Sequence, residues 1–298
     1  MSTGSRHPLD GASVACGEIV TILRLKAALA LPVEADCITP DRFVGLSQDK
    51  VAALPVLCGR RWLALGELFT VTEDSAAAPN RGYGIPQIVI EGDLSHVKRI
   101  GQGMSQGSIT IYGNVGMHLG TQMSGGEIIV HGNVGAWAGA QMTGGMIRLC
   151  GNAGPMLGGA YPGEVRGMSG GTILVQGDAG ARAGERMRRG LIAVQGDAGE
   201  FAGARMIAGS LFVCGRLGAR AGAGMKRGSI VALGGLSARL LPTFRYACRY
   251  HPTFLPLCLR QLQEWGLPVT SQQVEGLYRR YTGDITTVGK GEILVYGR

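Results

Sequence analysis

Two consecutive segments, GSITIYGNVGMHLGTQMSG (107–125) and GEIIVHGNVGAWAGAQMTG (126–144), share one pattern of glycines, aliphatic residues and a methionine. The pattern returns in GTILVQGDAGARAGERMRR (171–189), GLIAVQGDAGEFAGARMIA (190–208) and GSLFVCGRLGARAGAGMKR (209–227). The glycine before the Asn/Asp position falls at residues 113, 132, 151, 177, 196, 215 and 234, so the copies are 19 residues apart except for one spacing of 26. A fixed period of this length is typical of solenoid proteins.

Each copy begins with aliphatic residues that alternate with variable ones, which is the pattern of a strand with one buried face. The inward pairs are Ile109/Ile111, Ile128/Val130, Ile147/Leu149, Ile173/Val175, Ile192/Val194 and Leu211/Val213. A repeat of 19 residues is too short for a strand, a helix and a return, whereas short strands joined at glycine corners fit, because glycine permits positive φ and close backbone approach. The sequence therefore predicts an all-β solenoid, a right-handed parallel β-helix with about 19 residues per coil.

Small α/β capping segments are expected to flank the solenoid, because terminal coils expose unpaired strand edges. We expect residues 1–80 to form an N-terminal α/β cap, 81–236 the parallel β-helix, and 237–298 a C-terminal helical segment with a final strand. The seven extra residues of the longer copy lie between Gly158 and Met168 and should bulge out as a surface loop.

The outward position in the middle of each strand is too apolar to remain in water. Its occupants are Thr110, Ile129, Arg148, Leu174, Ala193, Phe212 and Val231. Apolar patches of this kind mark interfaces, so another chain or a flanking segment should cover them. A helix within 254–266 could do so, with Leu257, Leu259, Leu262 and Trp265 on one face.

Two further rows recur once per copy and could be misread as metal sites. The methionine row is Met104, Met123, Met142, Met168, Met187, Met206 and Met225, and the Asn/Asp row is Asp93, Asn114, Asn133, Asn152, Asp178 and Asp197. No His or Cys recurs beside the methionines, as a copper or haem site would need, so we interpret them as an internal packing column. The spacing of calcium-binding nonapeptides is absent, so the Asn/Asp row is expected to satisfy backbone groups at turns.

Composition and charge narrow the class of protein. There are 51 glycines but only 12 prolines and no three-residue period, which argues against collagen and disorder. The net charge of +8 admits an anionic partner, but the basic residues are not interleaved with stacking aromatics, so nucleic acid is disfavoured. The seven cysteines are scattered without a CxxC pair, and neither a leader nor a membrane-spanning run is evident, which predicts a cytoplasmic protein.

The sequence contains no recognisable catalytic constellation, and we expect no catalytic residue and no metal ligand in this chain. Cys248, His251 and Cys258 form the only Cys/His cluster, which is incomplete as a four-ligand site. Glycine-rich strings such as GNVGAWAG recur as coil corners instead of opening one helix after one strand, so a dinucleotide site is not indicated.

The late copies carry an unusual concentration of arginine. We name as a candidate docking surface the residues Arg182, Arg186, Arg188, Arg205 and Arg220. Arg186 and Arg205 are equivalent residues of adjacent copies, and like charges on neighbouring strands repel. Either these side chains splay apart on a solvated face, or they face an acidic partner or a bound polyanion, and we expect the latter of Arg186 and Arg205.

The repeats resemble the non-catalytic C-terminal β-helix domain of glutamate synthase. Together with LPVEADCITPDRFVGLS (31–47), ALGELFTV (64–71), YTGD (281–284) and KGEILVYG (290–297), they are more closely similar to the C subunits of formylmethanofuran dehydrogenase and of the related formyltransferase/hydrolase complex of methylotrophs. The resemblance covers most of residues 20–298.

This resemblance implies a structural subunit whose complex converts formyl-tetrahydromethanopterin to formate through a methanofuran-type carrier. It implies three partners: an amidohydrolase-like subunit, a formyltransferase subunit and a further subunit. No cofactor is expected to bind this chain tightly, although the polyglutamyl tail of such a carrier is a second possible ligand of the arginines. Arginine outnumbers lysine, which is more typical of a GC-rich genome than of a methanogen. This composition favours the hydrolytic complex of methylotrophs over the dehydrogenase. A free-standing β-helix enzyme acting on an acidic polymer is the alternative from another class.

Overall fold

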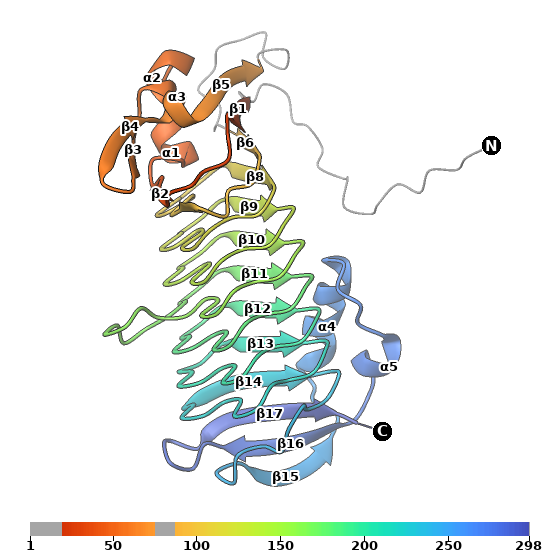
Figure 1. The fold of residues 1–298 in the computed structure, drawn as a ribbon. Helices are drawn as coiled ribbons and strands as arrows, with labels where there is room; N and C mark the ends of the chain where they lie inside the picture. The colour runs from red at the N-terminus through yellow and green to blue at the C-terminus, as the bar shows by residue number, and fades with distance from the viewer. Residues whose placement is uncertain (1–19, 75–86, 298) are drawn as a thin grey trace, which may run out of the picture.

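The structure, a computed structural model, describes residues 20–74 and 87–297. It is mostly β and contains one sheet of 13 strands, most of them parallel, and a second sheet of four strands. Figure 1 shows the repeats stacked one on another between an N-terminal and a C-terminal cap. Parts of the expected N-terminal cap, residues 1–19 and 75–80, lie outside the described residues.

Each repeat contributes one short strand to the large sheet. These strands are β6 (Gln87–Glu91), β8 (Ser108–Tyr112), β9 (Glu127–Val130), β10 (Met146–Leu149), β11 (Thr172–Val175), β12 (Leu191–Val194), β13 (Ser210–Val213) and β14 (Arg227–Ala232). Successive strands are parallel, and equivalent residues of neighbouring repeats are partners, as in Ile109↔Ile128 and Ile192↔Leu211. The predicted strands and their register are therefore confirmed.

A second parallel seam runs beside the glycine corners. Single-residue bridges join Leu94, Val115, Val134, Ala153, Ala179, Ala198, Leu217 and Leu236 in order. Next to this seam, the Asn114 Oδ1 accepts the backbone N–H of Asn133 at 2.9 Å, and each later member of the Asn/Asp row serves the next repeat in the same way through Asp197 and Arg216. The expected backbone role is confirmed, but the bond reaches the following repeat instead of closing a local turn.

The interior between the two seams is a continuous apolar core. All seven methionines of the row are fully buried, as are the inward aliphatic residues of the strands. A flexible thioether suits this position because it fills irregular gaps. The core explains the corner glycines as well: a Cβ added at Gly120 would lie 2.7 Å from the Ile147 Cδ1, and Gly120 has a φ of +59°.

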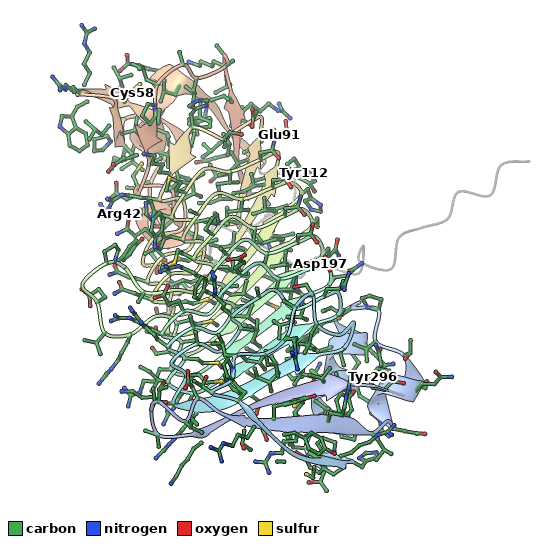
Figure 2. All side chains as sticks on the ribbon, turned by 60° about the horizontal axis from the view of Figure 1, so that its bottom comes forward. Arg42, Cys58, Glu91, Tyr112, Asp197 and Tyr296 are labelled. Atoms are coloured by element: carbon green, nitrogen blue, oxygen red, sulfur yellow. The ribbon has the colours of Figure 1, made fainter. Side chains whose placement is uncertain are left out.

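Different elements close the two ends of the stack. At the N-terminal end these are β1 (Val20–Leu25), β2 (Val33–Glu34), α1 (Pro40–Phe43), α2 (Gln48–Ala52), β3 (Pro55–Cys58), β4 (Arg61–Ala64), α3 (Leu65–Leu68), β5 (Phe69–Asp74) and β7 (Val97–Lys98). At the C-terminal end they are β15 (Arg245–Tyr250), α4 (Leu255–Glu264), α5 (Ser271–Val274), β16 (Tyr278–Gly283) and β17 (Lys290–Tyr296). β1 pairs parallel to β6 and antiparallel to β5, and β17 pairs parallel to β14, so both sheet ends are continued by cap strands. Arg42 and Cys58 mark the N-terminal cap and Tyr296 the C-terminal one in Figure 2.

Helix α4 covers the outer face of the sheet over the late repeats. Leu255, Leu259 and Leu262 are fully buried, in a cluster with outward strand residues that include Leu174 and Phe212. The predicted covering helix is thus confirmed, but the placement of Leu257 on the covering face was wrong, because this residue is 78% exposed. Positions 255, 259 and 262 share one helical face, and residue 257 falls opposite to it.

We expect Met187→Ala to lower the free energy of unfolding by about 2–5 kcal/mol, because it leaves a cavity in a core that other repeats hold in place. Met146→Ala is the matched control, since Met146 is only partly buried. Chemical denaturation, monitored by circular dichroism, measures the free energy of unfolding of both variants. Equal losses for Met187→Ala and Met146→Ala would contradict the packing role of the column.

Candidate functional site

The tight corners of the repeats place large side chains in two surface rows. The backbone is left-handed, with φ between 57° and 67°, at Arg99, His118, Trp137, Met156, Arg182, Phe201 and Arg220. A second row, Gln122, Gln141, Arg186 and Arg205, has φ between 53° and 59°. Residues other than glycine are held in this region only where the surrounding structure enforces it, and such strain often accompanies function. The five arginines of the candidate docking surface include two members of each row.

Arg182 and Arg220 of the first row enclose an aromatic ring. Their guanidinium carbons lie 5.5 Å and 5.3 Å from the centre of the Phe201 ring, one on each neighbouring repeat. Stacking on the ring orients both guanidinium groups by cation–π attraction. Both side chains remain more than half exposed, at 51% and 58%, so their outer faces are open to a ligand.

The candidate docking surface formed by the five arginines, called the arginine surface below, contains a buried negative charge at Glu185. Its side chain is only 7% exposed, and its carboxylate lies 3.3 Å from the Arg182 Nη1 and 3.9 Å from the Arg205 Nη1. The Arg220 Nη1 lies 3.6 Å from the carboxylate of Glu200, an exposed pair of small energetic value. The repulsion expected between Arg186 and Arg205 is therefore offset in part within the chain.

Arg186 has a different kind of partner. Its Nη1 donates to the backbone carbonyl oxygen of Glu164 at 2.6 Å, in the loop that carries the seven extra residues. This contact satisfies a donor of Arg186 without neutralising its positive charge. Glu185 and Phe201 thus link three of the five predicted arginines, Arg182, Arg205 and Arg220. Arg186 shares none of these contacts, and within the described ranges Arg188 makes neither an ion pair nor a side-chain hydrogen bond.

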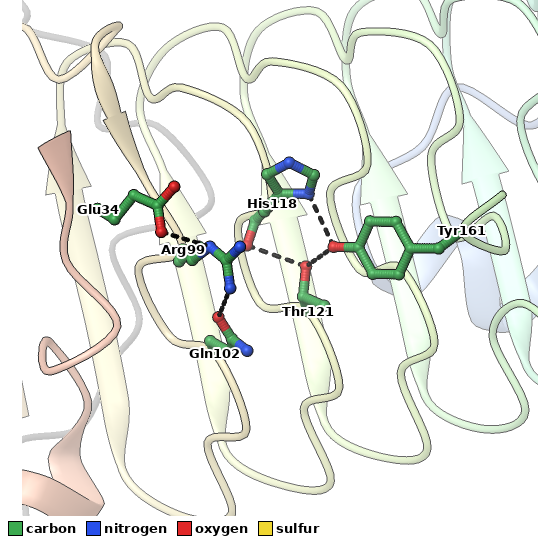
Figure 3. A network of polar contacts seen from close by, with 6 residues as sticks. All are labelled: Glu34, Arg99, Gln102, His118, Thr121 and Tyr161. Atoms are coloured by element: carbon green, nitrogen blue, oxygen red, sulfur yellow. Dashed lines mark hydrogen bonds and ion pairs between the residues drawn. The ribbon is translucent and has the colours of Figure 1, made fainter. Parts of the chain in front are cut away.

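A polar and aromatic cluster, which the sequence did not predict, lies on the earlier repeats (Figure 3). The Tyr161 hydroxyl lies 2.7 Å from the His118 Nδ1 and 3.2 Å from the Thr121 Oγ1, and Thr121 donates to the His118 carbonyl oxygen at 3.0 Å. The Trp137 ring stacks on the His118 ring, with 5.5 Å between centroids. His118 and Trp137 stand one period apart in the sequence, which is a signal of stacking, but no sequence signal places Tyr161 against them.

The groups around this cluster keep it uncharged. Burial lowers the pKa of His118, and the positive charges of Arg99 and Lys98 lower it further, against a smaller opposing effect of Glu34. Burial also raises the pKa of Tyr161. Both side chains are therefore neutral at pH 7, where a neutral imidazole and a phenol can share one hydrogen bond. Arg99, beside them, lies 3.2 Å from the Glu34 carboxylate. The arrangement fastens the inserted loop to earlier repeats.

Two other kinds of site are absent from residues 20–74 and 87–297. In these residues, no group of three or more His, Cys, Asp or Glu side chains is arranged to hold a metal ion. None of the helices in the same ranges has the length and apolarity that a membrane span requires. The arginine surface and the Tyr161 cluster are the two polar assemblies considered further.

Comparison with known proteins gives the chain its relatives. No protein-family model matches the sequence. The C subunit of the molybdenum-containing formylmethanofuran dehydrogenase 1 is 38% identical over 104 residues in Methanosarcina barkeri (35% of this chain, 33% of the relative) and 45% identical over 99 residues in Methanothermobacter marburgensis (33% and 23%). The C subunit of the formyltransferase/hydrolase complex Fhc of Methylorubrum extorquens is 40% identical over 100 residues, 34% of each chain. These matches span about a third or less of each curated relative.

A solved structure extends the similarity to nearly the whole chain. It is a chain in the crystal structure of the formyltransferase/hydrolase complex (FhcABCD) from Methylorubrum extorquens in complex with methylofuran. The sequences are 38% identical, the TM-score is 0.83, and the match covers 93% of this chain and 100% of that chain. Identity of this extent over a complete relative shows common descent and not merely a shared fold, and so the protein belongs to the family formed by the C subunits of formylmethanofuran dehydrogenases and formyltransferase/hydrolase complexes.

Proposed function

We propose that this chain is the non-catalytic structural subunit of a formyltransferase/hydrolase complex that converts formyl-tetrahydromethanopterin to formate through a methanofuran-type carrier. The observation that carries the proposal is the match to a chain of the FhcABCD complex, which covers 93% of this chain and all of the relative. The C subunit of a formylmethanofuran dehydrogenase is the second candidate, because relatives with that name match at similar identity. The Fhc relative covers a similar third of this chain by sequence, so the preference for the hydrolytic complex rests on the match to the solved FhcABCD structure.

The fold supports a scaffold role. We propose that the stacked repeats are a right-handed parallel β-helix, with 1–80 and 237–298 as caps and 81–236 as the solenoid. Two parallel seams, one of strands and one of single bridges, support this class. The recurring inward residues fill the core, and the recurring Asn/Asp side chains bind backbone groups. Recurrent positions are thus used for stacking, which suits a rigid support better than a free-standing enzyme acting on an acidic polymer.

The proposed assembly contains an amidohydrolase-like subunit, a formyltransferase subunit and a further subunit, with no nucleic acid and no membrane as partner. Carrier and tetrahydromethanopterin are substrates of the complex, and this chain binds neither tightly. The solved relative was crystallised with methylofuran, which supports use of such a carrier by the complex. The six cysteines of the described residues are free thiols, in keeping with a reducing cytoplasm.

The arginine surface is proposed to dock an acidic partner subunit or the polyglutamyl tail of the carrier. Arg182 and Arg220 are oriented by Phe201 yet more than half exposed, and Arg186 keeps a charge that no carboxylate of the described residues neutralises. Neighbouring coils are about 4.8 Å apart, so guanidinium groups recur along the stack and can accept a series of carboxylates by charge-assisted hydrogen bonds. Glu185 limits the surplus charge, which favours a few specific contacts over a broad basic field.

The purified chain alone should not transfer or hydrolyse a formyl group, and should co-purify stoichiometrically with the other subunits when all are co-expressed. Formate release from formyl-tetrahydromethanopterin, with carrier present, measures the first point, and size-exclusion chromatography with light scattering the second. Turnover by the isolated chain, or a failure to assemble, would refute the scaffold proposal.

The double variant Arg186→Gln/Arg205→Gln should weaken docking at the arginine surface, and binding by the unmodified chain should weaken as salt rises, because the attraction between exposed charges is screened. Arg239→Gln/Arg260→Gln is the control with the same loss of charge at exposed positions elsewhere. Complex assembly and affinity for a polyglutamylated carrier are measured at low ionic strength.

Loss of assembly in Arg186→Gln/Arg205→Gln would identify a subunit surface, and selective loss of carrier affinity a tail site. If neither property differs from that of the control, the five arginines form an ordinary solvated face.

A further inference from the structure

The long repeat interrupts the stack with a loop that leaves the body of the molecule (Figure 1). The loop comprises residues 159–167, and its base is closed by the bond from the Met168 N–H to the Gly158 carbonyl oxygen at 2.8 Å. All the extra length is therefore placed outside the stack, which keeps its register on both sides. Compact loops with closed ends are frequently functional.

Contacts at three points hold the loop in one conformation. Tyr161 is bound to His118 and Thr121 on an earlier repeat. On the later side, the Arg186 Nη1 binds the Glu164 carbonyl oxygen at 2.6 Å, and the Gly167 N–H binds the Arg186 carbonyl oxygen at 2.9 Å. A turn closes the tip, since the Glu164 N–H donates to the Tyr161 carbonyl oxygen at 3.0 Å. The conformational entropy of the loop is thus already reduced before any partner binds.

The side chains at the tip face solvent although the loop is fastened. Val165 is 68% exposed, and its neighbour Arg166 is exposed as well. A hollow lies beside them, lined by Gln141, Glu164, Val165, Arg166, Gly167 and Ser169. A single exposed valine is ordinary, but here it stands on a protruding, preordered tip next to a concavity. A protein that binds this tip would therefore meet both a projecting side chain and a recess.

We propose that the loop of residues 159–167 is a docking element that inserts Val165 into an apolar socket of a partner protein, with acidic side chains of that partner facing Arg166. The inference rests on the proposed function, because it assigns the loop to one subunit interface of the complex. Charge complementarity defines the partner: Arg166 at the tip and Arg186 at the base outweigh Glu164, the single acidic residue of the loop. A polyanionic carrier tail offers no apolar surface for Val165 to contact, so the ligand of the loop is a protein surface.

The test compares Val165→Asp with Val288→Asp, two substitutions of exposed valines on different parts of the surface. Val165→Asp should raise the dissociation constant of this chain for the other subunits at least tenfold, because it places a carboxylate in an apolar socket with an acidic rim. Val288→Asp should stay within twofold of the unmodified chain. Thermal unfolding by circular dichroism should be unchanged in both, since neither side chain is buried.

Two further measurements separate docking from folding and from self-association. Hydrogen exchange of the 159–167 peptide should slow on assembly of the complex and be independent of the concentration of the free chain. Tyr161→Phe, which removes the hydroxyl but keeps the ring, should speed exchange of that peptide in the free chain and weaken assembly less than Val165→Asp does.

Each outcome decides the proposal. The docking proposal is refuted if the unmodified chain and Val165→Asp assemble equally well. It is also refuted if hydrogen exchange of the loop is the same in the free and the assembled chain. In both cases the proposed scaffold function stands. If protection of the 159–167 peptide from exchange increases with the concentration of the free chain, the loop contacts a second copy of this chain and not a partner subunit. If the unmodified chain does not assemble at all, the proposed function fails, and the docking loop with it.

Discussion

The backbone hydrogen bonds between equivalent residues of successive repeats are the constraint on which the rest of this structure depends. Each repeat donates to and accepts from its two neighbours, as when the Val115 N–H binds the Asn133 carbonyl oxygen and the Val134 N–H binds that of Asn152. A shift of one residue would turn every inward side chain outward. The repeats therefore keep one length, and the extra residues of the long one are confined to a loop whose base is closed by Gly158 and Met168.

Stacking equal repeats also places identical side chains on top of one another, with opposite consequences inside and outside. Inside, the columns of aliphatic residues and methionine form one apolar core. On the outside, equivalent residues of like charge repel, and the late repeats relieve this locally. Glu185 is buried between Arg182 and Arg205, and Phe201 separates Arg182 from Arg220. Arginine can thus recur along the stack while the side chains of Arg182, Arg205 and Arg220 stay more than half exposed.

The ends and the outer sheet face show why such a stack needs additional elements. β17 adds to the last repeat strand from more than fifty residues downstream, and α4 folds back over β11 to β14, whose middle residues are buried. On β8 to β10, the equivalent residues Thr110, Ile129 and Arg148 remain partly exposed. The chain therefore covers only the later part of its outer face with its own helix, and Arg148 is balanced there by Glu127 at 2.8 Å.

The sequence by itself determined what recurs: the parallel strands, the inward aliphatic residues, the buried methionines and the position of the inserted loop all follow from one period. The tertiary structure decided the contacts that do not recur. Tyr161 reaches His118 across 43 residues, Arg186 binds the carbonyl of Glu164, and Leu257 points away from the sheet that Leu259 covers. The physical reason is that a period reports interactions repeated in every coil, whereas a loop or helix is placed by single long-range contacts, which leave no repeated pattern in the sequence.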